Sequence, residues 1–291
     1  MTIATCYLSP EGVVLGADST TTYGALHFNN SQKLFEIGEE STLAAVAWGL
    51  GGLQISSHRT LLALLDDDLR KNPPATNNEA ANRWTDQFWA AYSDPGSPIS
   101  PAIAECQRLH AKKPFDPKTP DPSGRTEAEE REYQQLRVVL VAGFCIAGYV
   151  LPDRTPAAFE VVFDPLQSKP TPTSKPQGYW FWGAPNMIQR LIFACDDELK
   201  SSIVGSGKWS GRRQELEALV AQHALAHPIV PIREAIDFVH ACISSTIKAF
   251  KFSNLSQICG GPIEIAVITT DRKFRWVRHK AWDAAITEGE R

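Results

Sequence analysis

The chain has 291 residues, of which 43% are hydrophobic and 21% charged, and its formal net charge is -4. This length suits one large domain or two small ones, and the composition is that of a soluble globular protein. A weakly acidic surface does not attract a polyanion, which argues against a nucleic-acid partner. No apolar run is long enough for a membrane span, and no signal peptide is apparent, so we expect no membrane partner.

The six cysteines are widely scattered. They form no Cys-x-x-Cys pair and no metal-ligand spacing with histidine. Several lie inside apolar runs, as free buried thiols do. We therefore predict no metal site and a reducing cytoplasm as the location of the protein.

The first fifty residues have the pattern of short antiparallel strands. We expect strands over residues 3–7, 13–15, 33–37 and 42–47, with a turn at Ser9-Pro10-Glu11-Gly12. Amphipathic helices are then predicted over residues 61–69 and 80–92. The stretch 94–131 is rich in proline and charge, so it is predicted to be an irregular surface segment within an insertion of about residues 72–136.

The second half repeats the order of strands followed by helices. Strands are predicted over residues 137–150, 157–163 and 178–182, helices over 186–199 and 231–251, and a final hairpin over 263–268 and 274–277. Neither half can bury a sheet alone, and two sheets packed face to face with outer helices would cover every apolar face. We therefore expect an α+β protein with a four-layer αββα sandwich, as a single domain spanning 1–291.

Three residues form the strongest candidate site: Thr2, Asp18 and Lys33. A hairpin brings the start of one strand and the end of the next to one rim, where Thr2 and Asp18 can meet. A hydroxyl is a weak nucleophile and needs a base, which the free amine of Thr2 can supply if Met1 is removed. The ammonium of Lys33 would lower the pKa of that amine, and Asp18 would hold Lys33 in place.

These residues lie in segments that resemble a known family. The segments are TIA at 2–4, EGVVLGADS at 11–19, KLFEIG at 33–38, REAI at 233–236 and CGGPIEI at 259–265. In this order they resemble a proteasome β-type subunit, a member of the proteasome-like N-terminal nucleophile hydrolases. The resemblance implies a threonine-type hydrolase with catalytic Thr2, Asp18 and Lys33. It does not cover residues 70–137.

The resemblance also implies supporting and substrate-binding residues. The oxyanion donor falls at the backbone N–H of Trp48 or Gly49. Ser256 and Cys259 stand where the family has an aspartate and a serine that hold the amine, and Ala184 replaces a serine before a helix. Substrate would meet a polar loop and a first specificity pocket, formed by Thr21, Thr22, Ser31, Phe35 and Val46. No residue of this set is charged, which favours cleavage after small to medium apolar residues.

Each residue also has an ordinary structural interpretation. Thr2 suits a strand start, Asp18 a turn and Lys33 an edge strand, and only their combination favours function. A rival set of histidines comprises His58, His223, His227 and His240, and His223 and His227 have the spacing of one helix face. No glutamate stands beside His223 as in metalloproteases, and no Gly-x-Ser-x-Gly serine hydrolase motif occurs.

The resulting hypothesis is a cytoplasmic amide-bond hydrolase, most simply a peptidase that acts on peptides through Thr2 after removal of Met1. It needs no metal or organic cofactor. The resemblance implies a homo-oligomer in a ring or stack, and the sequence identifies no partner ATPase. Two alternatives remain open: an amidase or acylase on the same scaffold, and an inactive scaffold or assembly protein.

Overall fold

The computed structural model describes residues 2–23, 26–118, 121–225, 227–253 and 258–280. It divides into two compact units. Unit 1 comprises Met1–Leu34, Gln177–Asp271 and Arg275–Arg291, and unit 2 comprises Phe35–Pro176 and Arg272–Phe274. Each unit is built on its own antiparallel five-stranded sheet.

Unit 1 contains a five-stranded sheet in the order β10-β1-β2-β11-β12. Its strands are β1 (Ile3–Ser9), β2 (Gly12–Ala17), β10 (Gly178–Gly183), β11 (Glu264–Thr269) and β12 (Arg272–Arg278), the first residues of which belong to unit 2. A separate pair, β3 (Thr21–Tyr23) and β4 (Leu26–Phe28), forms a small hairpin. The helices are α5 (Asn186–Phe193), α6 (Asp197–Gly205), α7 (Arg213–Ala221) and α8 (Ile232–Lys251).

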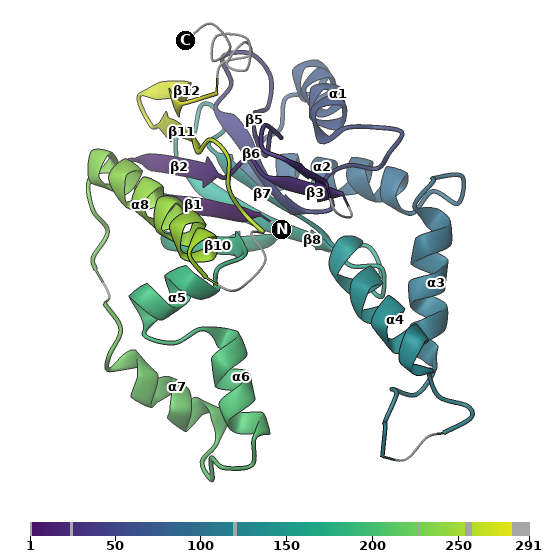
Figure 1. The fold of residues 1–291 in the computed structure, drawn as a ribbon. Coiled ribbons are helices and arrows are strands. Elements are labelled where there is room, and N and C mark those ends of the chain that lie inside the picture. The colour runs from purple at the N-terminus through teal and green to yellow at the C-terminus, as the bar shows by residue number, and fades with distance from the viewer. Residues whose placement is uncertain (1, 24–25, 119–120, 226, 254–257, 281–291) are drawn as a thin grey trace, which may run out of the picture. The chain divides into compact units, whose positions relative to one another are not determined.

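The long helix α8 lies along β1 and β2 and covers one face of this sheet, beside α5 (Figure 1). Its apolar side recurs every three or four residues, and Val239 and Ile243 are fully buried. The approach is close at Gly16, where an added Cβ would lie 2.6 Å from Val239 Cγ1. A glycine in the middle of β2 therefore lets the helix rest on the sheet.

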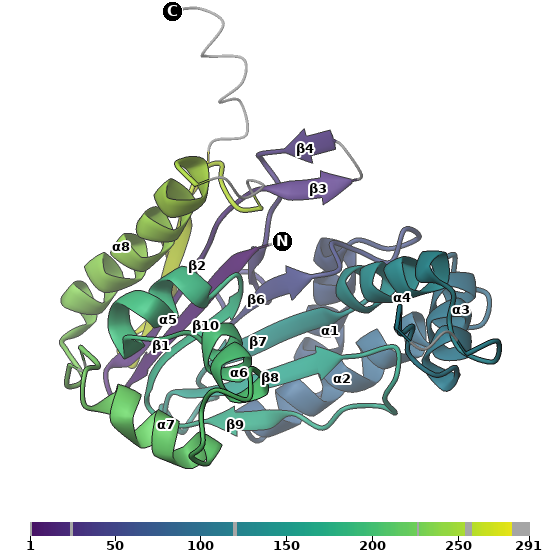
Figure 2. The same ribbon diagram turned by 60° about the horizontal axis from the view of Figure 1, so that its bottom comes forward.

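Unit 2 contains the second five-stranded sheet, in the order β5-β6-β7-β8-β9. Its strands are β5 (Leu34–Glu36), β6 (Leu43–Gly49), β7 (Ala142–Gly148), β8 (Ala157–Phe163) and β9 (Thr173–Lys175). The helices are α1 (His58–Lys71), α2 (Asn77–Tyr92), α3 (Ser100–Ala111) and α4 (Glu127–Val139). Helix α2 packs on β7 and β8, and α1 packs on α2 (Figure 2).

The core of unit 2 is aromatic. Trp84 and Phe88 of α2 are fully buried against Phe144 of β7 and Phe163 of β8. Aromatic side chains bury a large apolar area each, so this cluster fixes α2 on the sheet. The same core includes four leucines of α1: Leu61, Leu62, Leu65 and Leu69.

The expected four-layer αββα sandwich is wrong. The structure is α+β, with two antiparallel five-stranded sheets and eight helices among the described residues, and each sheet has helices from its own unit on one face. The expectation assumed that neither half could cover its sheet without the other. The helices α8 and α5 in unit 1, and α2 and α1 in unit 2, supply that cover locally.

The segment expected to be irregular is also largely helical. Helices α3 and α4 pack on one another around Cys106, Leu109 and Tyr133. Helix α4 begins with a capping box, in which the Thr126 hydroxyl accepts from the N–H of Glu129 and the Glu129 carboxylate accepts from the N–H of Thr126. High charge and proline content conceal these helices, because their prolines lie at ends and loops. The predicted strand from residue 137 begins only at Ala142, because α4 continues to Val139.

The other predicted elements are present, with shifted ends. The predicted helix over residues 186–199 is interrupted, because Ala194 has a left-handed φ of 62° and α6 starts beyond it. The prediction of one domain over 1–291 and an insertion over about 72–136 stays a prediction.

Candidate active site

Thr2 and Asp18 lie at one rim of the sheet in unit 1. Strand β1 begins directly after Thr2, and β2 ends directly before Asp18. In the register of this hairpin Ala4 is opposite Ala17. The Ile3 N–H donates to Asp18 Oδ1 at 3.1 Å, and the Asp18 N–H donates to the Ile3 carbonyl at 3.2 Å. The carboxylate thus holds the backbone immediately after Thr2.

Asp18 is fully buried and accepts four hydrogen bonds. Oδ1 accepts from the Ile3 N–H and from Lys33 Nζ, the latter at 2.7 Å. Oδ2 accepts from the Thr20 N–H at 3.2 Å and from the Gly260 N–H at 2.9 Å. A carboxylate with this many donors is stabilised in its charged form even without water.

Lys33 is buried beside Asp18. Its Nζ forms the ion pair with Asp18 and donates a second hydrogen bond to the carbonyl of Thr20. Burial lowers the pKa of Lys33 below its usual value, while the charge and hydrogen bond of Asp18 oppose that shift. A buried positive charge at this position would lower the pKa of a neighbouring amine. Because its own pKa is lowered, the Lys33 ammonium also releases its proton more readily than a lysine in water.

Thr2 is itself nearly inaccessible, at 4% exposure. Its carbonyl accepts from the Ala184 N–H at 2.8 Å. At Gly183 the backbone φ is +81°, and an added Cβ would lie 1.9 Å from the Thr2 carbonyl oxygen. The Gly183-Ala184 turn before α5 therefore fixes Thr2 through the main chain, for which the alanine side chain is not needed.

Cys259 and Gly260 stand on the other side of Asp18. Besides the Gly260 contact, the Ser19 N–H donates to the Gly260 carbonyl at 3.0 Å. Cys259 is fully buried, and burial raises the pKa of its thiol to about 12, with the Asp18 charge adding to the rise. The thiol is therefore neutral and a poor nucleophile at neutral pH. Ser256 lies outside the described residues.

The predicted substrate-binding residues fall in both units. Thr21 and Thr22 lie on β3, where Thr21 pairs with Phe28 and Thr22 with His27. Ser31 closes this loop, since its N–H donates to the Ser19 carbonyl at 2.9 Å. These residues belong to unit 1, as do Thr2, Asp18 and Lys33.

Four other predicted residues belong to unit 2. Phe35 on β5 packs in the hydrophobic core of that unit. On β6, Val46 is fully buried and Trp48 is opposite Gly143, where an added Cβ would lie 2.1 Å from the indole. Gly49 ends β6 with a φ of +82°. Their roles in substrate and oxyanion binding stay predictions.

The rival histidines do not form a cluster of ligands. His58 is buried against Phe88 and Phe144 in the core of unit 2. His227 stacks with Tyr179 in unit 1, with ring centroids 4.8 Å apart. Over the described ranges, no group of three or more His, Cys, Asp or Glu side chains could hold a metal ion.

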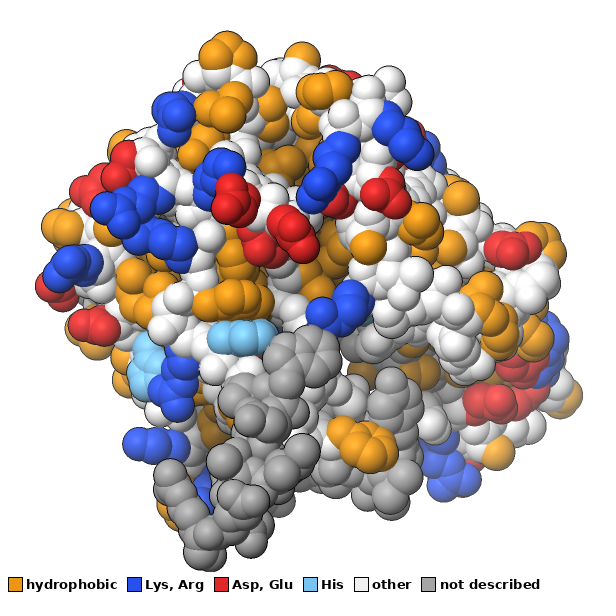
Figure 3. Space-filling view, turned by 90° about the horizontal axis from the view of Figure 1, so that it is seen from above, with side chains coloured by type: hydrophobic (Ala, Val, Ile, Leu, Met, Phe, Trp, Pro, Cys, Tyr) orange, Lys and Arg blue, Asp and Glu red, His pale blue; other side chains and the backbone are white. Residues whose placement is uncertain are grey.

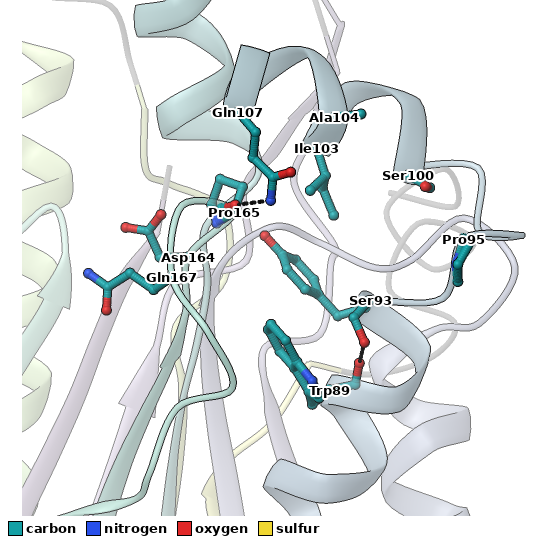
Figure 4. A pocket seen from close by; sticks show the side chains of 11 residues that line it. Trp89, Ser93, Pro95, Ser100, Ile103, Ala104, Gln107, Asp164, Pro165 and Gln167 are labelled. Carbon is teal, nitrogen blue, oxygen red and sulfur yellow. Dashed lines mark hydrogen bonds between the residues drawn. The ribbon is translucent and has the colours of Figure 1, made fainter. Parts of the chain in front are cut away.

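A separate cavity of about 310 Å³ lies within unit 2, between α2, α3 and the loop after β8 (Figure 4). Three of its polar side chains are engaged in the structure of the unit. The Gln107 amide donates to the Pro165 carbonyl at 2.8 Å, the Tyr92 hydroxyl to the Leu140 carbonyl at 3.0 Å, and the Ser93 hydroxyl to the Trp89 carbonyl. The cavity holds none of the candidate residues and pairs no nucleophile with a base.

The molecular face in Figure 3 shows Lys and Arg side chains interspersed with Asp and Glu, with no broad area of one sign. Such a surface offers no extended basic patch for a polyanion on that face. None of the helices in the described ranges is long and apolar enough to cross a membrane.

Comparison with known proteins defines the fold at a coarse level. The chain shares its overall fold with a solved structure, at low sequence identity. One similar solved structure is an Anbu mutant from Hyphomicrobium sp. strain MC1, with a TM-score of 0.51 and 14% identity. The match covers 99% of this chain and 91% of that one. At this identity the likeness shows the fold alone.

The assignment to the proteasome β-type subunits is wrong. No model of a protein family matches the chain. No curated protein matches it either. The short segments that carried the resemblance fall on β1, β2, β5, the first turn of α8 and the start of β11, so they are scattered over both units.

Three contributors to the site were not predicted. Thr20 and Gly260 act through the main chain, which leaves little signal in a sequence. Glu264 is different, because a carboxylate that begins an otherwise apolar, fully buried strand is unusual. The sequence alone therefore shows that Glu264 is unusual, and in the structure this carboxylate accepts a hydrogen bond from Lys280.

Proposed function

We propose that the protein is a threonine-type amide-bond hydrolase, most simply a peptidase, with Thr2 as the nucleophile after removal of Met1. One observation carries the proposal: Asp18 Oδ1 joins the backbone that follows Thr2 to the ammonium of Lys33, through bonds of 3.1 Å and 2.7 Å. A buried ion pair next to a strand-start hydroxyl is costly for stability alone, and a catalytic role accounts for it.

In the proposed reaction the Thr2 hydroxyl attacks the carbonyl carbon of the substrate. The free amine of Thr2 takes the hydroxyl proton, and the resulting ammonium gives it to the leaving amine. An acyl-enzyme ester forms, and the amine then activates water to hydrolyse it. The positive charge of Lys33 keeps the amine unprotonated near neutral pH, and Asp18 keeps Lys33 in place. The backbone N–H of Trp48 or Gly49 is our candidate donor to the oxyanion.

The substrate class and location extend this proposal. Thr21, Thr22, Ser31, Phe35 and Val46 are uncharged, so we expect cleavage after small to medium apolar residues. The six cysteines are buried and form no disulfide, which supports a reducing cytoplasm. Self-association of the chain is also proposed, and light scattering of the purified protein tests it.

The experiment is covalent trapping with a peptide epoxyketone, which forms a ring with the hydroxyl and the amine of the same N-terminal threonine. We expect mass spectrometry to find one adduct, on Thr2 of chains that lack Met1, and peptide hydrolysis to stop. Thr2→Ala should give no adduct. An active preparation that retains Met1 throughout would exclude this mechanism.

A second candidate function is an inactive scaffold on the same fold. Two observations favour it: Ala184 carries no hydroxyl, and the Cys259 thiol, whose pKa is raised, cannot share a proton at neutral pH. An amidase or acylase is distinguished from a peptidase by substrate, so acyl-amides and peptides should be assayed side by side.

A further inference from the structure

Lys280, which follows β12, lies at the same rim of unit 1 as Asp18. Its Nζ donates to the Ser31 carbonyl at 2.9 Å, to Ser19 Oγ at 3.2 Å and to Glu264 Oε2 at 2.9 Å. The side chain is 12% exposed. Three acceptors thus satisfy the three N–H groups of one nearly buried ammonium.

Glu264 anchors this lysine from the sheet. It begins β11 directly opposite Ala17 of β2, and its side chain is fully buried. Its other oxygen, Oε1, lies 2.7 Å from Nδ1 of His279, an ion pair when the imidazole is protonated. The His279 ring stacks on Trp276, with centroids 4.0 Å apart. The segment that follows β12 therefore holds Oε2 through Lys280 and places the His279 ring beside Oε1.

The two groups that Lys280 binds in the loop stand at the two ends of one segment. Ser19 and Ser31 already approach each other, because the Ser31 N–H donates to the Ser19 carbonyl. The β3–β4 hairpin lies between them, and so does Thr20. Thr20 presents its carbonyl to Lys33 Nζ and its N–H to Asp18. Whatever fixes Ser19 and Ser31 therefore fixes an acceptor of Lys33.

We propose that Lys280, held by Glu264, is a positioning residue that clamps the base of the β3–β4 hairpin and thereby orients Lys33 through Thr20. This inference rests on the proposed function of Thr2. Burying a second charged pair beside Asp18 and Lys33 is expensive, and an apolar pair would fill the same space more cheaply. Charged hydrogen bonds are directional, so Lys280 can hold two separate groups of the loop, the Ser31 carbonyl and the Ser19 hydroxyl. An apolar pair could not hold them in this way.

The test compares Lys280→Met and Lys280→Arg with the wild type. The matched control is Lys273→Met on the preceding strand β12, since the Lys273 pair with Glu40 is exposed. For Lys280→Met we expect kcat to fall about 10–100-fold with KM changed less than about 3-fold, because misplacement of a catalytic group affects the chemical step. Lys280→Arg should lose less, and Lys273→Met should match the wild type.

Hydrogen exchange of the Ser31 amide gives a readout without catalysis. Lys280→Met should accelerate it at least about 10-fold, since the bond to Ser19 loses its neighbouring clamp. Unchanged exchange would overturn the clamp. Faster exchange with unchanged kcat in an active enzyme would overturn its positioning role. If the wild type hydrolyses nothing, faster exchange in Lys280→Met still supports the clamp, and only the proposed function fails.

Discussion

The Oδ1 atom of Asp18 lies 2.7 Å from the Nζ atom of Lys33, and both groups are shielded from water. Neither charge has bulk solvent to stabilise it, so each depends on the other and on neighbouring main-chain groups. The same Oδ1 atom accepts from the N–H of the residue after Thr2. A substitution at Asp18, at Lys33 or at the start of β1 should therefore alter the environment of the other two.

Replacing the nucleophile tests the proposal directly. Thr2→Ala should reduce peptide hydrolysis by several orders of magnitude, because no covalent intermediate can form. It should leave the fold intact, since one small side chain is removed at a strand start. Initial rates with fluorogenic peptides and circular dichroism measure the two effects.

Thr5→Ala is the matched control for this substitution. Thr5 lies three residues further along, on β1, and its hydroxyl donates to the Gly16 carbonyl at 3.2 Å. Its loss should cost about 1 kcal/mol of stability with activity retained. Equal activity of Thr2→Ala and Thr5→Ala would exclude Thr2 as the nucleophile.

The buried pair should behave as one unit. Lys33→Met or Asp18→Asn alone leaves an uncompensated buried group, which we expect to cost about 3–5 kcal/mol of unfolding free energy. The double variant should recover part of that loss, while its hydrolysis should be no slower than that of either single variant. Urea unfolding and turnover are measured on all four proteins. If the two losses of unfolding free energy add in the double variant, and the two reductions in turnover multiply, Asp18 and Lys33 act independently.

The lowered pKa of Lys33 predicts an alkaline dependence of stability. Its folded-state pKa lies below 10.5, so between that folded value and 10.5 the unfolded chain binds more protons than the folded chain. The free energy of unfolding should therefore rise with pH in this window and reach its full value above 10.5. Lys33→Met should lack this rise, whereas Lys273→Met should keep it. A wild type with a flat profile in this window would contradict the shift.

The site shows what local pattern can and cannot predict. The hairpin of β1 and β2 follows from alternation and a turn, and it suffices to place Thr2 beside Asp18. Lys33 could be predicted as a strand start nearby. Gly260 and Lys280 could not, because they reach the rim across more than two hundred residues of chain, through contacts that leave no periodic signal.

The same limit explains the errors in the fold. Helix α4 contains mostly charged or polar residues, so its hydrophobic period is weak, and only the Thr126–Glu129 capping box marks it. The sandwich was inferred from the need to cover two sheets, but that need does not say which elements provide the cover. Sequence periodicity defines faces, and the partners of those faces are decided by tertiary packing.

The last prediction concerns His58 in unit 2. It is 5% exposed, its Nε2 has no hydrogen-bond partner, and burial lowers its pKa to about 4 from an unfolded value of 6.5. Because the unfolded chain takes up the proton first, stability should be full above pH 6.5 and fall as the pH drops toward 4. The difference of pKa corresponds to about 3 kcal/mol. His58→Leu should remove this loss between pH 6.5 and pH 4, measured by urea unfolding followed through tryptophan fluorescence. The exposed His223 provides the control, since His223→Leu should leave the acid profile as in the wild type. If wild type and His58→Leu lose stability in parallel as the pH falls, His58 is not the neutral buried imidazole that this core requires.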